Sequence, residues 1–194
     1  MGGNPSLTGV SSDVARMSAA SDRVERSTSL VGDLFDTHQS QLYRLARRMA
    51  RTSDEARDLV QETFVRVARN PGSIPPDAHS ARAWLVRILV NVSRDEWRKR
   101  LSRGRLDSHH LIETRALAPA NQEAALIAQT TIWTAMQLLP PRRRAALVLF
   151  ELEGVEIKDI ARLLGVSAVT VRWHLSRGRR ELARIIAQYD RRER

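Results

Sequence analysis

The chain has 194 residues, of which 42% are hydrophobic, and its 32 Lys and Arg residues against 22 Asp and Glu residues give a net charge of +10. The length suits two small domains, and the absence of cysteine excludes a disulfide framework, a thiolate metal site and a cysteine nucleophile. No run of apolar residues reaches the roughly 18 that a membrane helix needs, and the N-terminal residues lack the apolar core of a signal peptide. These features predict a cytoplasmic protein with no membrane contact of its own.

The positive charge favours a polyanionic partner. Only Lys99 and Lys158 are lysines, so thirty of the 32 basic residues are arginines. A net positive surface binds nucleic acid through phosphate contacts and counterion release, and arginine adds planar donors suited to phosphate and guanine edges. A compositional habit of the source genome is the alternative explanation for the arginine preference, but it explains the net charge less well.

The chain divides into a tail, two helical blocks and a linker. Residues 1–28 are rich in Ser, Ala, Gly and Thr and are expected to form a mobile tail. Apolar residues recur at helical spacing over residues 29–103 and again over residues 122–190. Residues 104–121 contain both Gly and Pro, the two residues that most often interrupt helices, and are the expected flexible linker. No alternating strand pattern occurs, so the predicted fold class is all-α, with two small helical domains joined by that linker.

The first well-defined helix is expected over residues 54–69, "DEARDLVQETFVRVAR". Its core stripe consists of Ala56, Leu59, Val60, Phe64 and Val67. The opposite face carries Asp58, Gln61, Glu62 and Val65, at spacings of three and four residues that place them side by side. This acidic face is either an ordinary solvated surface or a docking site for a basic partner helix.

A Pro/Gly-rich break over residues 70–80 precedes a second helix over residues 81–100, "ARAWLVRILVNVSRDEWRKR". Its buried stripe is expected to contain Trp84, Leu85, Ile88, Leu89 and Val92. A second stripe carries Arg87, Asn91, Arg94 and Arg98. Like charges that are neighbours on a helix repel one another, so this basic row is either a solvated face or a track for phosphates.

The clearest motif lies near the C-terminus, in "GVEIKDIARLLGVSAVTVRWHLSRGRREL" (154–182). A short helix over 156–164 should end at Gly165, which suits a left-handed residue. Ser167 is a good N-cap for the next helix. The two helices and their short turn have the pattern of a helix-turn-helix.

On the second of these helices, successive residues are rotated by about 100°, which places a core stripe and an exposed stripe on opposite sides. The core stripe holds Val171, Leu175, Gly178 and Leu182, and the opposite side carries Val169, Trp173, Ser176 and Arg180, flanked by Arg172 and Arg177. An exposed tryptophan among arginines suits a helix in a major groove, where Arg reads guanine or phosphate and apolar groups meet thymine methyls. The alternative is a solvated charged face with the tryptophan packed against a neighbour.

Three segments together resemble a known family. "ARDLVQETFVRV", "RAWLVRILVNVSRDEWRKR" and "LPPRRRAALVLFELEGVEIKDIARLLGVSAVTVRWHLSRGR" are similar, in this order, to three regions of the extracytoplasmic-function (ECF) group of bacterial RNA polymerase sigma factors. One helix-turn-helix is common, whereas all three segments in this order and spacing are specific. The resemblance covers most of residues 30–185.

The resemblance implies partners and roles. The first domain would contact the clamp helices of core RNA polymerase through Asp58, Gln61 and Glu62, and would recognise and open the minus-ten promoter element. There the 70–80 loop would capture an extruded base while Asn91, Arg94 and Arg98 track the strand. The second domain would sit on the polymerase flap and read the minus-thirty-five element through Arg172, Trp173, Ser176 and Arg177. The family also implies an anti-sigma partner and a stress- or signal-responsive regulon.

This chain departs from the family pattern at two places. Trp173 and His174 stand where the family usually has Ser and Arg, which leaves the upstream sequence preference open. Arg57 stands where an acidic residue is usual, which weakens the resemblance of the clamp-contact face.

Other functional classes fit the sequence less well. No Gly-rich phosphate loop and no nucleophile motif occur, so we expect a protein that is not an enzyme and binds no cofactor. The adjacent histidines His109 and His110 lie in the linker without further ligands, which argues against a zinc site. A polymerase-independent helix-turn-helix regulator is the main alternative, but it has no need for the basic row on the 81–100 helix. A purely structural adaptor leaves the charge of +10 unexplained.

Overall fold

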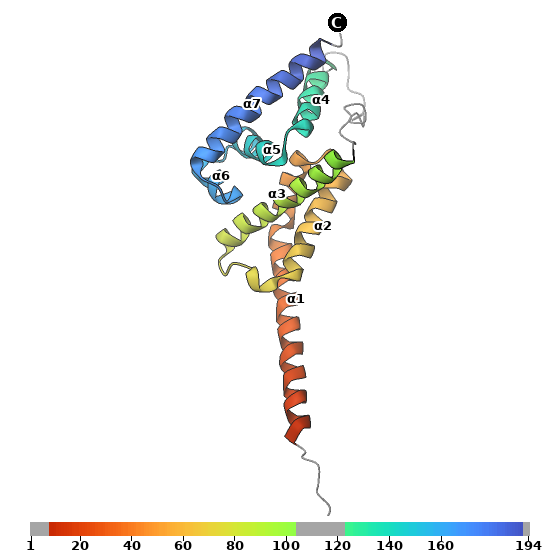
Figure 1. Cartoon of the computed structure of the whole chain (residues 1–194), viewed down its shortest axis with the longest axis vertical. Helices are drawn as coiled ribbons and strands as arrows, with labels where there is room; N and C mark the ends of the chain where they lie inside the picture. Colours follow the sequence, from red (N-terminus) through yellow and green to blue (C-terminus); the bar gives the residue numbers. More distant parts are fainter. Residues whose placement is uncertain (1–7, 104–122, 192–194) are drawn as a thin grey trace, which may run out of the picture.

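The computed structural model describes residues 8–103 and 123–191, and these residues form helices with no strand among them (Figure 1). The first half contains α1 (Thr8–Met49), α2 (Ser53–Arg69), a short 3-10 helix η1 (Pro71–Ser73) and α3 (Ala78–Ser102). The second half contains α4 (Glu123–Leu138), α5 (Pro141–Leu147), a π-helical turn η3 (Val148–Leu152), α6 (Ile157–Leu164) and α7 (Ala168–Asp190). The predicted all-α fold with two helical regions is confirmed. The predicted linker, 104–121, lies outside the described residues.

The start of α1 differs from the prediction. The helix begins at Thr8, so residues 8–28 of the predicted tail are helical in the structure, and the mobility of residues 1–28 stays a prediction. Among the residues of α1 whose burial the structure describes, Leu34 is the first that is fully buried, and Val31 packs against the core beside it. The earlier part of α1 projects away from the other helices in Figure 1. Helix formation is limited by its nucleus, and each further residue adds a hydrogen bond at little cost. A helix that starts in the packed part therefore extends through a segment free of proline, even without an apolar stripe.

The first half is built around the stripes that the sequence predicts. All five core residues predicted on α2 are buried, and α3 buries Leu85, Leu89 and Val92. Side-chain caps set where these helices begin: Thr52 Oγ1 accepts a hydrogen bond from the Glu55 amide (3.1 Å) and Asp77 Oδ1 accepts one from the Ser80 amide (2.8 Å). Such caps satisfy amide groups that have no partner within the helix.

The second half forms the predicted helix-turn-helix. Gly165 has φ +65°, and the amides of Gly165 and Val166 donate to the carbonyls of Arg162 (3.3 Å) and Ala161 (3.0 Å), the bond pair of a Schellman motif. Ser167 then caps α7 by accepting a hydrogen bond from the Thr170 amide (3.1 Å). Because a left-handed residue is favourable mainly for glycine, Gly165 is what allows the turn to be this short.

The two halves also pack against each other, which the sequence did not indicate. Helix α3 contacts both α5 and α6, and α1 contacts α5 and η3. The buried apolar residues of both halves form one continuous cluster, in which Leu85 and Leu89 of α3 belong with Leu147 and Ile160 of the second half. The described chain therefore has a shared core rather than two separate ones.

Candidate nucleic-acid interface

The outer face of α7 is open to solvent. Arg172, Ser176 and Arg177 are exposed, and Trp173 has an exposed fraction of 51%. Neither Arg172 nor Arg177 forms an ion pair with any residue that the structure describes, so their donors are available to an external acceptor. The opposite face is buried, with Val171 at 0% exposure, as the sequence predicts. The structure thus brings the four predicted upstream-element residues together on one accessible face.

Trp173 and His174, which depart from the family pattern, lie on different faces of α7. The Trp173 ring has the guanidinium of Arg143 above it, 5.4 Å from its centre, and Arg143 is itself held by Glu181 at 2.5 Å. His174 is buried, and burial lowers its pKa, with the positive charges of Arg142 and Arg143 acting in the same direction. His174 is therefore neutral at pH 7 and belongs to the core, whereas Trp173 faces outward.

The predicted basic row on α3 is only partly accessible. Arg98 is exposed, while Asn91 and Arg94 are half-buried. Arg87 is covered by the helix-turn-helix: a Cβ atom added at Gly165 would lie 2.8 Å from the Arg87 Cδ. In this arrangement the row is not the continuous open track that its spacing suggests, because its first residue lies beneath the turn before α7.

The predicted acidic face lines a groove between α2 and α3. Asp58 and Gln61 are exposed, and Glu62 Oε1 accepts a hydrogen bond from Arg66 Nε (3.0 Å). Its lining also includes the apolar side chains of Leu59, Val65 and Val92 and the basic side chains of Arg51, Lys99 and Arg100. Such a mixture of an acidic rim and an apolar floor suits a basic amphipathic helix.

Arg57, the other departure from the family pattern, is exposed and paired with Asp54 on the same helix. Its charge is therefore partly offset by a neighbouring carboxylate at the surface. Arg57 is not among the residues that line the groove.

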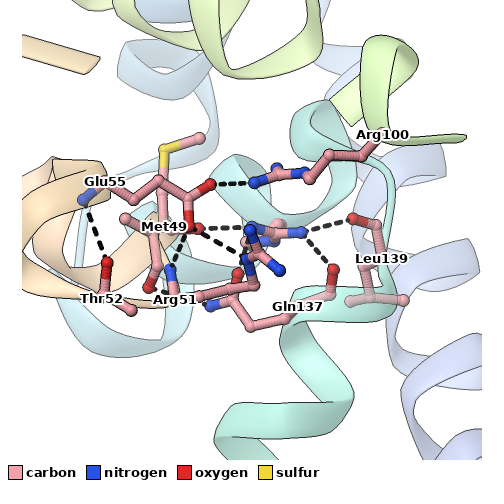
Figure 2. Close-up of polar contacts among 9 residues, drawn as sticks. Met49, Arg51, Thr52, Glu55, Arg100, Gln137 and Leu139 are labelled. Carbon is pink, nitrogen blue, oxygen red and sulfur yellow. Dashed lines mark hydrogen bonds and ion pairs between the residues drawn. The ribbon is translucent and has the colours of Figure 1, made fainter. Parts of the chain in front are cut away.

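Glu55 occupies the end of this groove, and the sequence did not single it out. Its carboxylate accepts hydrogen bonds from the Arg51 amide (2.9 Å) and Arg51 Nε (3.2 Å), and it pairs with Arg100 of α3 (Figure 2). Burial acts to raise the pKa of Glu55, but the hydrogen bonds and charges of Arg100 and Arg51 outweigh it and hold that pKa below its usual value. The charged carboxylate therefore ties α2 to α3 at neutral pH.

Replacing Glu55 by glutamine is expected to lower the free energy of unfolding at pH 7 by about 1–3 kcal/mol, because two arginines lose a charged acceptor. A carboxylate whose pKa is depressed on folding stabilises the protein above its unfolded pKa and ceases to do so as the pH falls through its folded pKa. The difference in unfolding free energy between the two proteins should therefore shrink as the pH falls below 4.5, the ordinary pKa of a glutamate. Chemical denaturation from pH 3 to 7 measures this, with the exposed Asp36→Asn as control; a constant difference contradicts it.

Arg144 is the functional candidate that the sequence analysis missed. It is 1% exposed and lies on α5. It donates to the carbonyl of Met49 at the end of α1 and to the carbonyls of Gln137 and Leu139, in the last turn of α4 and just after it. Burial lowers its pKa to about 9, with Arg100 and Arg51 lowering it and Glu55 raising it, so it stays charged at pH 7. The sequence contained one indication that Arg144 is buried, because Arg144 shares a helical stripe with Pro141, Ala145 and Val148.

Two other predictions concern a metal site and contact with a membrane. Within residues 8–103 and 123–191, no cluster of three or more His, Asp or Glu side chains could hold a metal ion; His109 and His110 lie outside these residues. Among the same residues, no helix has both the length and the apolarity needed to cross a bilayer.

Comparisons with known proteins match both halves. Residues 34–103 match the family Sigma-70 region 2, and residues 129–182 match the family Sigma-70, region 4. The chain is 36% identical over 154 residues to the ECF RNA polymerase sigma factor SigM of Mycobacterium tuberculosis, covering 79% of this chain and 75% of SigM.

Two solved structures have a similar fold. CnrH, in complex with the cytosolic domain of CnrY, superposes with a TM-score of 0.52 at 25% identity, covering 81% of this chain and 88% of CnrH. The sigma factor RpoE of Bartonella quintana, in complex with the anti-sigma factor NepR, gives a TM-score of 0.50 at 23% identity, covering 86% of this chain and 97% of RpoE.

Proposed function

This chain belongs to the ECF sigma factors of RNA polymerase, which direct transcription initiation, and from that premise we propose how its two halves divide the task. The first half docks on core polymerase and opens the minus-ten element. The second half reads the minus-thirty-five element with α7. The alternative of a polymerase-independent regulator has no support among the relatives.

The observation that carries this proposal is the combination of two different surfaces in one chain. The outer face of α7 offers Arg172 and Arg177, which form no ion pair with any described residue, beside an exposed Trp173, and this suits a major groove. The groove between α2 and α3 offers the acidic Asp58 and Glu62 beside the neutral Gln61, and these carboxylates disfavour DNA and suit a basic protein helix. The first surface supports contact with promoter duplex and the second supports contact with the polymerase clamp helices.

Asn91, Arg94 and Arg98 are proposed to contact the downstream element once it is single-stranded. Arg98 is already exposed, and the side chains of Asn91 and Arg94 are half-buried. A basic groove that tracks a backbone binds single strands with little sequence preference. The segment over residues 70–80, whose last three residues begin α3, is proposed to receive the extruded base.

Further roles follow from family membership. We expect the second half to sit on the polymerase flap, an anti-sigma protein to sequester the chain, and a stress- or signal-responsive regulon to depend on it. The chain would act in the cytoplasm, where core polymerase is found, and by binding rather than by catalysis.

The direct test is transcription with reconstituted holoenzyme, with promoters selected by sequencing. We expect promoter-specific opening only when both the chain and core polymerase are present, and weak, steeply salt-dependent binding of duplex DNA by the chain alone. Tight, sequence-specific binding by the free chain at physiological salt contradicts the proposal and favours an independent regulator.

Reversing the charge of the acidic groove is expected to weaken polymerase binding. Glu62→Lys or Asp58→Lys should lower the affinity for core polymerase by about tenfold or more, because a basic helix would then meet a like charge. Pull-down and titration with core enzyme measure the effect, and circular dichroism checks the fold. Asp36→Lys is the control, since Asp36 is exposed on α1 and does not line the groove. Unchanged affinity in both groove variants shows that the docking face lies elsewhere.

A further inference from the structure

We propose that a cavity between α1, α3 and α6 binds a small organic acid, which has a compact apolar body and one carboxylate. The cavity has a volume of about 220 Å³. An engineered apolar cavity of about 150 Å³ holds benzene, so this one has room for a ligand somewhat larger than benzene. Such binding goes beyond the proposed function and needs neither polymerase nor DNA.

The cavity is lined by apolar side chains from segments far apart in the sequence. They are Leu42 and Leu45 of α1, Leu85 and Val86 of α3, Leu149 of η3, Val155 before α6, and Leu163 of α6. Most of them belong to the buried core, where close packing holds side chains in fixed positions. The apolar walls are therefore formed before a ligand arrives, and binding costs little ordering of the protein.

One buried polar side chain in the lining lacks a partner. His38 of α1 is 7% exposed and forms no hydrogen bond with any described residue, and its Nδ1 is shielded from water. Burial lowers the pKa of His38, with the charge of Arg82 acting in the same direction, so the ring is neutral at pH 7 and carries one proton. A shielded N–H without an acceptor is costly, which favours the proton on Nε2. This nitrogen can then donate to a ligand in the cavity.

Two arginines determine the charge that the cavity favours. Arg44 of α1 and Arg82 of α3 are exposed members of the lining, and neither forms an ion pair with any residue that the structure describes. Among the lining residues Glu153 is the acidic one, and Arg48 pairs with it at 2.8 Å. The charge that remains unbalanced is positive, and arginine donates paired hydrogen bonds to a carboxylate.

The combination of these features favours an acid with an apolar body over simpler ligands. Inorganic phosphate would pair with the arginines but leave the apolar walls unfilled. A plain hydrocarbon would fill the walls but leave His38, Arg44 and Arg82 without partners. Ligand sites typically join apolar walls to a few polar groups that fix the orientation of the ligand, and only a ligand with both parts uses the whole lining.

The direct test is calorimetric titration of the full chain with phenylacetate. We expect saturable binding at one site, with a dissociation constant on the order of 1 mM or tighter. Phenylacetamide has the same shape without the charge, and inorganic phosphate has the charge without the apolar body. Each should bind more weakly by about tenfold or more. Equal binding of phenylacetamide and phenylacetate overturns the proposal.

A second acid distinguishes an aromatic ligand from an aliphatic one. Isovalerate carries the same carboxylate on a branched aliphatic body. Tighter binding of phenylacetate assigns the cavity to aromatic acids, and tighter binding of isovalerate assigns it to branched aliphatic acids. If neither acid shows saturable binding, the cavity is not a site for small organic acids.

Variants of the two exposed arginines test the charge. Arg44→Ala and Arg82→Ala should each lower the affinity for phenylacetate by about tenfold, and Arg82→Lys should recover part of it. The matched control is Arg69→Ala, because Arg69 is exposed on α2 and does not line the cavity. Circular dichroism checks the fold. Unchanged affinity in both Arg44→Ala and Arg82→Ala contradicts the proposed contact with the carboxylate.

His38→Leu separates ligand binding from a structural role. Replacing a buried polar group that has no partner by an apolar one is neutral or stabilising, so the melting temperature should stay the same or rise while the affinity for phenylacetate falls. A structural role for His38 predicts the opposite pair of results. Leu163→Phe tests the space itself, because Leu163 is half-buried and a larger side chain there should block phenylacetate with the fold intact. Normal binding in Leu163→Phe places the ligand elsewhere.

Transcription by reconstituted holoenzyme separates this proposal from the proposed function. A chain that supports promoter-specific transcription but binds neither acid refutes the ligand site alone. A chain that binds phenylacetate and loses that binding in Arg82→Ala, but never assembles with core polymerase, refutes the proposed function alone.

Discussion

Replacing Leu89 with alanine is expected to lower the free energy of unfolding by about 2–5 kcal/mol, which makes it the largest stability effect among our predictions. Leu89 lies in the middle of α3, is 0% exposed, and belongs to the cluster shared by both halves. Truncation removes apolar contacts and leaves a cavity that close-packed neighbours fill only in part. The cost should therefore reach the upper part of that range if the second half cannot move inward.

The matched control is Leu101→Ala on the same helix, because Leu101 is 52% exposed and its loss should change the free energy of unfolding by no more than about 0.5 kcal/mol. Chemical denaturation followed by circular dichroism gives both values. A single transition in the unmodified chain is expected from the shared core. Equal costs for the two variants show that α3 does not pack as described.

Truncating Arg177 is expected to cost about 1–3 kcal/mol of promoter binding if its guanidinium reads a guanine edge, with relaxed preference at one base pair. If it contacts a phosphate instead, Arg177→Ala should weaken all sequences about equally and lower the salt slope by about one unit. Arg177 is exposed and makes no ion pair within the described chain, so no internal partner competes for it. Arg172→Ala is expected to behave in one of the same two ways.

Trp173 should behave differently, because it carries no charge. Trp173→Ala is expected to leave the salt slope unchanged and to alter preference where a thymine methyl or a sugar packs against the indole. Ser176→Ala should have a smaller effect of the same kind. The measurement is promoter binding by holoenzyme over a panel of minus-thirty-five mutants at several salt concentrations.

The control for this series is Arg179→Ala on the same helix. Arg179 is exposed but already bonded to Glu151 (2.8 Å) and placed over the Phe150 ring, so its loss should not change sequence preference. If Arg172→Ala, Trp173→Ala and Arg177→Ala all bind like the unmodified protein while the fold is intact, then α7 is not the reading helix.

The sequence alone determined the features that depend on local patterns. The 3.6-residue period separates Val171 and Leu175 from Trp173 and Arg177 on α7, and the structure buries the first pair and exposes the second. Gly165 and Ser167 mark the turn because a left-handed residue and an N-cap each demand particular side chains. Helix periodicity and capping are short-range effects, so they can be read from neighbouring residues.

The start of α1 at Thr8 is a local feature that the sequence pattern did not predict. Residues 8–28 lack a clear apolar stripe, and a stripe is what predicts a packed helix. Their helical state follows from propagation out of the packed part of α1, which is a property of the whole helix and not of its first residues.

Only the tertiary structure decided how the halves meet. Arg144 looked like one arginine in a basic run, and its role depends on the carbonyl of Met49, which lies far away in the sequence. Arg87 looked like part of an open row, and it is covered by a turn nearly eighty residues further along. Sequence spacing shows which residues share a helix face, but what covers that face depends on how distant helices pack, which is why the contact between the halves appeared only in the fold.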